Sequence, residues 1–362
     1  MPAPTPLHSS PWDPTAFRAA IQHVLDNFLD EQSARLAPLG PDAERLVARA
    51  RESLTGGKRF RAAFCWWGYR AISPEVVDEL ALLRACAALE LLQASALVHD
   101  DLMDDSDTRR GRPATHKALE AEHVQQDWRG NPVQYGAAGA ILLGDLLLAW
   151  SDELLRRCGL PVAQVLPALE VFDLCRTEVI AGQFLDVSVQ ARGRADADEA
   201  MTVLRWKSAK YSIERPLHVG AALAGADTAT LERISAYGLP LGEAFQLRDD
   251  VLGVYGDPAT TGKPAGDDLV EGKRTVLVAH ALEYADAAEA AELDAALGTE
   301  LDEDAVQRLR TIITTSGAEA KVESEITDLT ARCLEGLEAA GLADEATAVL
   351  RGLAIDVTQR AL

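Results

Sequence analysis

The sequence predicts an all-α protein that forms one large helical domain. Alanine, leucine, glutamate and arginine dominate it, and these residues are strong helix formers. Strand signals are scarce, because alternating runs of β-branched and aromatic residues are few and no Asn-Gly or Asp-Gly hairpin turn occurs. With 362 residues and 48% hydrophobic content, the chain can bury a sizeable core, and it shows neither a short repeat nor a clear linker.

The first residues form a segment of a different kind. The stretch MPAPTPLHSSPWDP is polar and proline-rich, and it lacks the basic and apolar regions of a signal peptide. We therefore expect residues 1–15 to be a flexible tail and residues 16–362 to be the single helical domain.

Two long helices can be placed by their capping signals. Ser73 can cap a helix that has Pro74 at its first position and runs to about Met103. The turn at 225–227 ends one helical pattern and opens another, which runs to about Val254.

The remaining apolar segments predict packing helices. From about Leu282 the chain is acidic and alanine-rich, with the amphipathic spacing of outer helices. The longest apolar run, AILLGDLLLAW, is interrupted by Gly144 and Asp145 and is too short to cross a bilayer. We therefore expect no membrane span.

Charge and cysteine content narrow the range of functions. The formal net charge of −22 argues against nucleic acid as a general partner. The cysteine count is odd and no CxxC pair occurs, which predicts buried thiols in a reducing cytoplasm. The five are Cys65, Cys86, Cys158, Cys175 and Cys333.

The stretch HDDLMDDSDTRRGRP, residues 99–113, concentrates carboxylates at the end of the first long helix. Asp100 and Asp104 are one turn apart and share a helix face, with Asp101 beside them. A solvated acidic loop is the alternative, but the run directly follows an apolar helix, and the helix dipole disfavours anions at this end. Hard oxygen ligands in this arrangement suit Mg²⁺ that completes its shell with phosphates.

A second acidic pair closes the other long helix. In FQLRDDVLGVYGD, Asp249 and Asp250 follow Gln246 by one turn. Two such pairs can face each other across a helical bundle and hold metal between them.

Cationic side chains accompany both aspartate runs, and guanidinium and ammonium groups pair with phosphates. They are Lys58, Arg59 and Arg61 in GGKRFR, Arg109, Arg110 and Arg112 after the first run, and Lys263, Lys273 and Arg274 after the second. Together they predict a site for two polyanions, one bridged by Mg²⁺ and one held by cations directly.

The combination of GGKxxR, DDxxD with RRGxP, Lys207-Ser208, and FQxRDD with GK and GDD resembles the trans-isoprenyl diphosphate synthases, or polyprenyl synthetases. The resemblance covers roughly Arg51 to Thr275. It implies an all-α fold around a deep central cavity and a homodimer. It also implies Mg²⁺-dependent head-to-tail condensation of isopentenyl diphosphate with an allylic diphosphate.

The resemblance further implies a role for each matching residue. Asp100, Asp104 and Asp249 would bind Mg²⁺, three ions with substrate bound, and Asp101 and Asp250 would orient those ligands. Arg109, Lys207 and Lys263 would hold the allylic diphosphate, Lys58, Arg61, Gln93 and Arg110 would hold isopentenyl diphosphate, and Lys273 would help to close the site. Ser208, Gln246 and the Lys207 carbonyl would lie near the developing carbocation.

Two features bear on the product and on rival functions. Ser95 and Ala96 are small where short-chain members carry an aromatic plug, and Leu92 lies one turn further from the motif, so we expect a C20 product, with C25 or longer as the alternative. The floor candidates are Phe172, Phe184 and Trp150, which could as readily be ordinary core residues. Gly253 replaces the third aspartate of the second motif. This glycine leaves the number of metal ligands open. It is the one support for a non-catalytic partner subunit as a rival function. A terpene cyclase is the other rival, although a cyclase needs no second diphosphate site.

Overall fold

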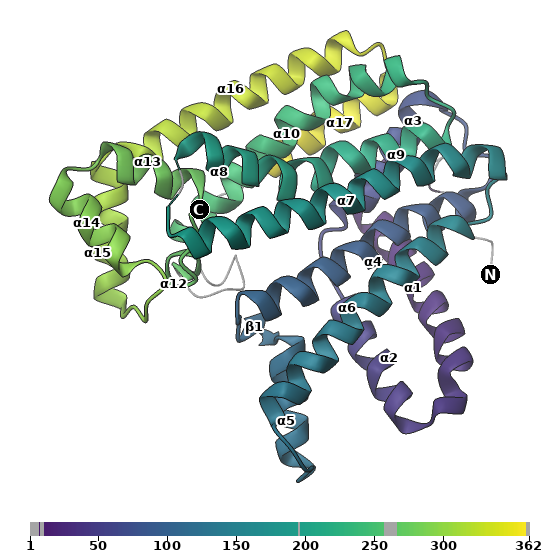
Figure 1. Cartoon of the computed structure of the whole chain (residues 1–362). Coiled ribbons are helices and arrows are strands. Elements are labelled where there is room, and N and C mark those ends of the chain that lie inside the picture. The colour runs from purple at the N-terminus through teal and green to yellow at the C-terminus, as the bar shows by residue number, and fades with distance from the viewer. Residues whose placement is uncertain (1–6, 8–10, 195, 257–265, 360–362) are drawn as a thin grey trace.

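The computed structural model describes residues 7, 11–194, 196–256 and 266–359. Within these residues the chain is a single bundle of helices with one two-residue β-hairpin, as Figure 1 shows. The all-α prediction is confirmed.

The helices of the first half surround the long helix α4, and the two short strands follow it. Their bounds are α1 Pro14–Leu36, the 3₁₀ turn η2 Ala37–Leu39, α2 Pro41–Ser53, α3 Phe60–Ile72, α4 Glu79–Met103, β1 Thr108–Arg109, β2 Arg112–Pro113, α5 Thr115–Gln125, α6 Pro132–Arg156 and α7 Val162–Arg192.

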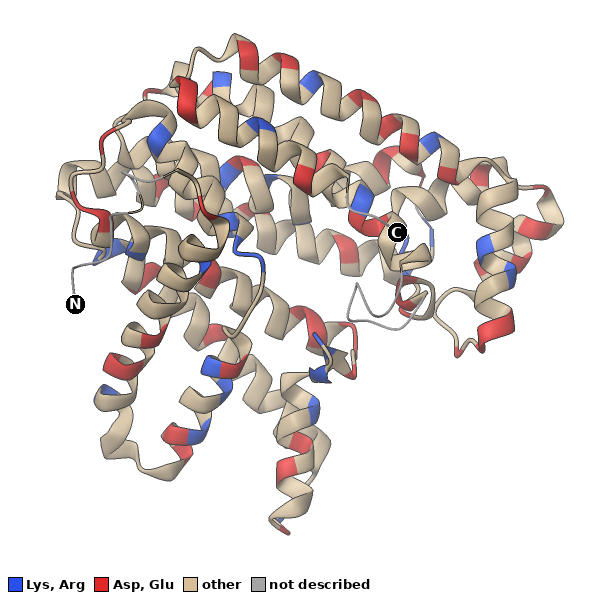
Figure 2. Ribbon diagram, turned by 180° about the vertical axis from the view of Figure 1, so that it is seen from behind, with Lys and Arg blue, Asp and Glu red and all other residues tan. Residues whose placement is uncertain are grey.

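The helices of the second half pack beside those of the first half and add an outer layer. Its elements are α8 Ala197–Leu204, the π-helical segment η3 Arg205–Glu214, α9 Arg215–Leu223, α10 Thr228–Tyr255, α12 Asp267–Val270, α13 Val276–Tyr284, α14 Ala287–Ala296, α15 Glu303–Thr315, α16 Ala318–Ala339 and α17 Asp344–Thr358. Figure 2 shows acidic residues, coloured red, spread along the outer helices, in keeping with the acidic C-terminal third of the sequence.

Helix α4 is the central helix of the first half. It is apolar nearly all round because it packs against α1, α3 and α6 at once. The predicted start at Ser73 is wrong: α4 begins at Glu79, and the Asp78 side chain caps it by accepting a hydrogen bond of 2.9 Å from the Ala81 amide. The Ser73 hydroxyl instead donates to the Glu75 carbonyl. The predicted end at Met103 is confirmed.

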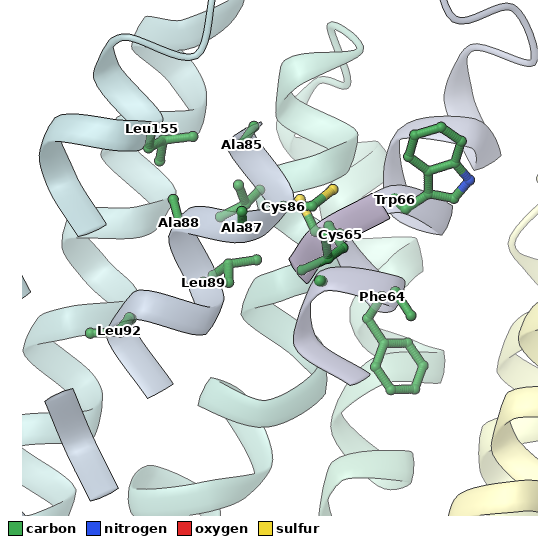
Figure 3. Close-up of a cluster of buried hydrophobic side chains, with 14 of the residues drawn as sticks. Phe64, Cys65, Trp66, Ala85, Cys86, Ala87, Ala88, Leu89, Leu92 and Leu155 are labelled. Carbon is green, nitrogen blue, oxygen red and sulfur yellow. The ribbon is translucent and has the colours of Figure 1, made fainter. Parts of the chain in front are cut away.

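The contact between α3 and α4 carries part of the main hydrophobic core (Figure 3). Phe64, Trp66 and Leu89 are fully buried there, and the thiols of Cys65 and Cys86 lie together. Burial raises the pKa of the Cys86 thiol well above its usual value, and contact with Cys65 adds to the shift. All five cysteines are buried and free, as predicted.

Helix α10 begins and ends close to the predicted positions. The Asp227 side chain caps it by accepting a hydrogen bond from the Thr230 amide, and Gly256 ends it. It packs along α16 and against η3, so it spans from the outer layer to the interior.

The N-terminal boundary lies earlier than predicted. Helix α1 starts at Pro14 and is capped by Asp13, so the expected boundary at residue 15 falls inside this helix. Trp12 packs edge-on against Trp67, with 5.3 Å between ring centroids, and 5.1 Å from Phe17. The core therefore extends at least to Trp12; residues 1–6 and 8–10 lie outside the described residues.

Two helices, α4 and α6, are long and apolar enough to cross a membrane by length and composition alone. The apolar stretch of α4 is 78% buried inside the bundle, which explains its composition as that of a core helix. The corresponding stretch of α6 is only 33% buried, so part of its apolar surface faces outward.

Candidate active site

A cavity of about 740 Å³ lies between α4, α7, α8, η3 and α10. This volume is in the range of small-molecule sites. The cavity is lined by the following residues singled out in the sequence: Lys58, Arg61, Gln93, Ala96, Asp100, Arg109, Arg110, Lys207, Ser208, Gln246, Asp249, Asp250 and Lys273. Asp100 and Asp249, which are 149 residues apart in the chain, therefore line the same cavity.

The end of α4 presents the first two carboxylates. Burial alone would raise the pKa of Asp100, but the charges of Lys207, Lys273 and Arg109 outweigh it and lower the pKa to about 2. Burial and the neighbouring charge of Asp100 raise the pKa of Asp104 to about 6. The two aspartates are thus crowded enough to differ strongly in their proton affinity.

Lysine 207 enters the cavity from the π-helical segment η3. Its Nζ lies 3.2 Å from Asp100 Oδ1 and 2.6 Å from Asp186 Oδ2. Burial disfavours the ammonium, yet Asp100 and Asp186 together raise its pKa. Gly182 of α7 allows this approach, because a Cβ there would lie 2.4 Å from the Lys207 amide nitrogen. Short π-helical segments are frequent at functional sites.

The arginines of the first motif are placed by the β-hairpin. Arg109 pairs with Arg112 across the strands, and Arg110 and Gly111 at the turn have φ of 53° and 72°. Positive φ at both central residues is the signature of a tight type I′ turn, and here an Arg-Gly pair makes it. The sequence rule that looked for Asn-Gly or Asp-Gly therefore missed this hairpin.

The two arginines of the turn point to different partners. Arg109 Nε donates to Asp101 Oδ1 at 2.7 Å, and Asp101 is buried. Asp101 therefore holds Arg109 in place, and Arg109 Nη2 also lies 3.8 Å from Asp100 Oδ2. Arg110 donates to the Thr55 carbonyl at 3.2 Å, next to the glycine turn that carries Lys58.

A second cluster forms where α3, α4 and η3 meet. The Arg61 guanidinium lies 4.2 Å from the Tyr211 ring centroid and donates to Ser212 Oγ at 2.7 Å. The Tyr211 hydroxyl donates to Gln93 Oε1. Burial raises the pKa of Tyr211, so this hydroxyl keeps its proton. Arg61 and Gln93 are thus held in place on one wall.

The second aspartate motif lies across the cavity on α10. Asp249 is exposed to the cavity, whereas Asp250 is buried and accepts a hydrogen bond of 2.8 Å from Gln246 Nε2. Burial raises the pKa of Asp250 well above its usual value. Lys273 bridges the two sides, with its Nζ 3.4 Å from Asp104 Oδ2 and 3.5 Å from Asp268 Oδ1.

Several predicted residues lie elsewhere. Ser95 is buried and its hydroxyl donates to the Gly144 carbonyl of α6 at 2.8 Å, so it faces a neighbouring helix. Leu92 is buried in the core, and of the predicted chain-length residues only Ala96 is among the residues lining the cavity. Lys263 lies outside the described residues.

None of the three aromatic floor candidates is among the described residues that line the cavity. Phe172 and Trp150 are buried in the hydrophobic core. Phe184 is 74% exposed on the surface. Phe172 and Trp150 are therefore ordinary core residues, which is the alternative that the sequence left open. The sequence could not rank the three candidates, because it does not show which face of each helix looks inward.

Two polar residues of α7 were missed. Gln183 Nε2 donates to Asp100 Oδ1 at 3.0 Å, and Asp186 holds Lys207. Both line the cavity, together with the apolar Val179 one turn earlier. In AGQFLDV the polar pair is spaced three residues apart in an otherwise apolar stretch, a signal that could have indicated an inward-facing polar stripe.

The carboxylates fit Mg²⁺ that a phosphate ligand would complete. The Asp104 side chain is 2% exposed, and its Oδ2 accepts no hydrogen bond from any described residue, although Lys273 lies 3.4 Å away. Within the described residues no three Asp, Glu, His or Cys side chains are gathered into a closed metal site. Oxygen donors with open positions suit Mg²⁺, which keeps waters and takes substrate phosphates.

Comparison with known proteins decides the family. The model of the polyprenyl synthetases matches residues 44–314. The chain belongs to the polyprenyl synthetase family. It is therefore a prenyltransferase of the trans-prenyl diphosphate synthase type, and the resemblance drawn from its motifs is confirmed.

Individual relatives span a range of product lengths. A solved geranylgeranyl pyrophosphate synthase of Corynebacterium glutamicum, complexed with isoprenyl diphosphate and magnesium, is 40% identical and has a TM-score of 0.94, covering 97% of this chain and 100% of that one. A geranylfarnesyl diphosphate synthase of Natronomonas pharaonis is 32% identical over 76% of this chain and 83% of its own. A (2E,6E)-farnesyl diphosphate synthase of Mycobacterium tuberculosis is 34% identical over 61% of this chain and 56% of its own.

Replacing Asp186 by asparagine tests its place in the polyprenyl synthetase site. The Lys207 ammonium would lose one of its two carboxylate partners, and we expect kcat/KM for chain elongation to fall about 10- to 100-fold. Asp198→Asn, at an exposed position in α8, is the control and should leave kcat/KM unchanged. Equal rates for both variants would remove Asp186 from the site.

Proposed function

We propose that this polyprenyl synthetase is a Mg²⁺-dependent geranylgeranyl diphosphate synthase. It would condense isopentenyl diphosphate with dimethylallyl, geranyl or farnesyl diphosphate and release pyrophosphate. Both aspartate motifs and two separate cationic groups line one cavity, and this observation carries the proposal. The Corynebacterium relative with bound magnesium and isoprenyl diphosphate supports the choice of metal and ligand.

The allylic diphosphate would lie between the two aspartate motifs. Asp100, Asp104 and Asp249 would hold Mg²⁺, three ions with substrate bound, which would neutralise the diphosphate as it departs. Lys207 and Arg109 face the same place and supply fixed positive charge. Breaking the bond between C1 and the diphosphate oxygen leaves an allylic cation there.

Isopentenyl diphosphate would lie at the second cationic group. Lys58, Arg61 and Arg110 surround one end of the cavity, and Gln93 is fixed beside them by Tyr211. The double bond of isopentenyl diphosphate attacks C1 of the cation, and the departing pyrophosphate accepts the proton that is then lost. Ser208 and Gln246 line the cavity and would face the carbocation with their polar atoms. Lys273 would help to close the site.

Two rival functions fit these contacts less well. A terpene cyclase ionises one diphosphate and needs no site for another, whereas here Arg61 is positioned by both Tyr211 and Ser212. A non-catalytic partner subunit would have no need for Asp100 to be paired with Lys207 and Gln183 inside the cavity. Both rivals predict that the purified chain alone elongates nothing.

The product length rests on the wall formed by α4 and its neighbours. Ala96 lines the cavity with Val179 of α7 and Val203 and Leu204 of α8, all of them aliphatic. An unplugged apolar wall at Ala96 supports a C20 product, and C25 remains the alternative.

The proposal also covers the oligomeric state of the enzyme and its place in the cell. Large apolar side chains on α6 and α7 are exposed in the single chain, including Leu142 at 62%, Ile180 at 58% and Phe184 at 74%. A second copy of this chain would cover them, giving a homodimer. We place the enzyme in the cytoplasm, in keeping with its free thiols. Sedimentation equilibrium that returned the monomer mass at micromolar concentration would exclude the dimer.

The decisive assay combines the purified chain, Mg²⁺, isopentenyl diphosphate and, separately, C5, C10 and C15 allylic diphosphates. We expect a discrete C20 alcohol after dephosphorylation. Asp100→Asn should lower turnover at least about 10²-fold, because it removes a charge that faces both the metal and Lys207. Asp105→Asn, an exposed aspartate of the same run, is the matched control. Near-normal turnover of Asp100→Asn would contradict the metal assignment.

Ala96→Phe tests the wall of the cavity. A phenyl ring at this position would shorten the space for the growing tail, so the main product should become C15 or C10. Ser95→Ala is the control, because Ser95 does not line the cavity and its hydroxyl donates to the Gly144 carbonyl of α6. Losing this hydrogen bond should lower the free energy of unfolding by about 1 kcal/mol without changing the product length. An unchanged product from Ala96→Phe would place the floor elsewhere.

A further inference from the structure

Glu178 of α7 is a buried carboxylate that is not among the described residues lining the cavity. Arg215 grips it with two parallel hydrogen bonds: Nε donates to Oε2 at 2.6 Å, and Nη2 donates to Oε1 at 2.7 Å. Lys210 Nζ also donates to Oε1, at 3.0 Å. Burial alone would raise the pKa of Glu178, but Arg215 and Lys210 lower it below its usual value. Glu178 is therefore a charged group shared by two cations.

The two cations lie on either side of one junction in the chain. Lys210 belongs to the π-helical segment η3, and Arg215 is the first residue of α9, directly after η3 ends. One carboxylate of α7 thus holds both the π-helical segment and the start of the next helix. Regular π-helix is rare and occurs mostly as single turns. A segment of 10 residues such as η3 therefore depends on its neighbours to keep this geometry.

A chain of hydrogen bonds fixes the remaining side of the Arg215 guanidinium. Its Nη1 donates to His218 Nδ1 at 3.0 Å, since a guanidinium can only donate. The other ring nitrogen lies 3.1 Å from the hydroxyl of Ser235 on α10, and this hydroxyl donates to Glu214 Oε1 at 2.7 Å. Burial lowers the pKa of His218 to about 4, so at neutral pH the ring is neutral and can accept from Arg215. Arg215 is thus held by α7 and, through His218, by α10.

The segment held in this way forms one side of the cavity. The residues of η3 that line the cavity are Lys207, Ser208, Tyr211 and Ser212. Lys210 directly precedes Tyr211 in the chain, and Glu178 lies one turn before Gly182, where the α7 backbone closely approaches Lys207. A shift of η3 along α7 would therefore move the Lys207 ammonium away from its two carboxylate partners.

We propose that Glu178 is a positioning residue for chain elongation, which acts through Lys210 and Arg215 to set the π-helical segment, and with it Lys207, at the cavity. The alternative is a role in stability alone. Buried ion pairs often stabilise a fold no better than apolar residues of the same size, so stability is a weak reason for three charged groups here. This inference rests on the proposed function.

The first test removes the charge of Glu178 and keeps its size. Glu178→Gln would release both cations, and we expect kcat/KM for elongation of geranyl diphosphate to fall about tenfold or more, because small displacements of groups that bind substrate are costly. Arg215→Gln should cause a similar loss. The double variant should be no slower than the slower single variant, since the two residues act as one unit. Strictly additive losses would overturn the inference.

Binding of Mg²⁺ with inorganic pyrophosphate reports on the position of Lys207 without turnover. Isothermal titration calorimetry should show an affinity at least about fivefold weaker in Glu178→Gln than in the wild type, because the ammonium no longer faces the diphosphate. A carboxylate that served stability alone would leave the affinity of the folded protein unchanged. All measurements are made well below the melting temperature of each variant.

Glu153→Gln is the matched control. The Glu153 carboxylate on α6 also accepts from several donors, Gln32 and Arg35 of α1 and the neighbouring Arg157, but it is outside the described lining of the cavity. Its loss should lower the melting temperature and leave both kcat/KM and the pyrophosphate affinity at their wild-type values.

Lys210→Met covers the case in which Glu178→Gln does not fold. It keeps the paired hydrogen bonds between Glu178 and Arg215 and should lower kcat/KM and the pyrophosphate affinity about threefold. Wild-type values for a folded Glu178→Gln, or for Lys210→Met where Glu178→Gln does not fold, would overturn this inference alone. Absence of elongation by the wild type with every primer would overturn the proposed function, while pyrophosphate binding would still test Glu178.

Discussion

The structure depends on keeping several carboxylates close together inside one cavity. Asp100 and Asp104 lie one helical turn apart with little solvent around them, which is costly for like charges. Cations from separate elements offset this repulsion: Lys207 from η3, Lys273 after α12, and Arg109 from the hairpin. The position of each of these elements is therefore set by the same charge balance.

That balance explains irregular features that would otherwise weaken the bundle. The π-helical segment and the glycine of α7 bring the Lys207 backbone close to α7, and a left-handed arginine turns the chain sharply after the first motif. Each departs from ideal helix geometry, and each lies beside the cavity. Under the proposed function, a magnesium diphosphate would exchange one set of ion pairs for another without changing the framework.

The sequence predicted the helical class, the second long helix and the meeting of the motifs, because helix periodicity and capping are local properties. It failed at Ser73, where a polar residue and a proline imitate a cap that Asp78 provides. It could not place Ser95, Leu92 or the aromatic floor candidates, since the direction of a side chain depends on which neighbour packs against its helix. Gln183 and Asp186 were missed for a related reason: their partners, Asp100 and Lys207, lie on other elements.

The five cysteines have a practical consequence beyond the core that they fill. All are buried, so a thiol reagent can reach them only when the surrounding helices open. Cys65 and Cys86 lie on α3 and α4, whereas Cys333 lies on α16 of the outer layer. The native chain thus carries internal reporters of local opening in two of its layers, without any engineered label.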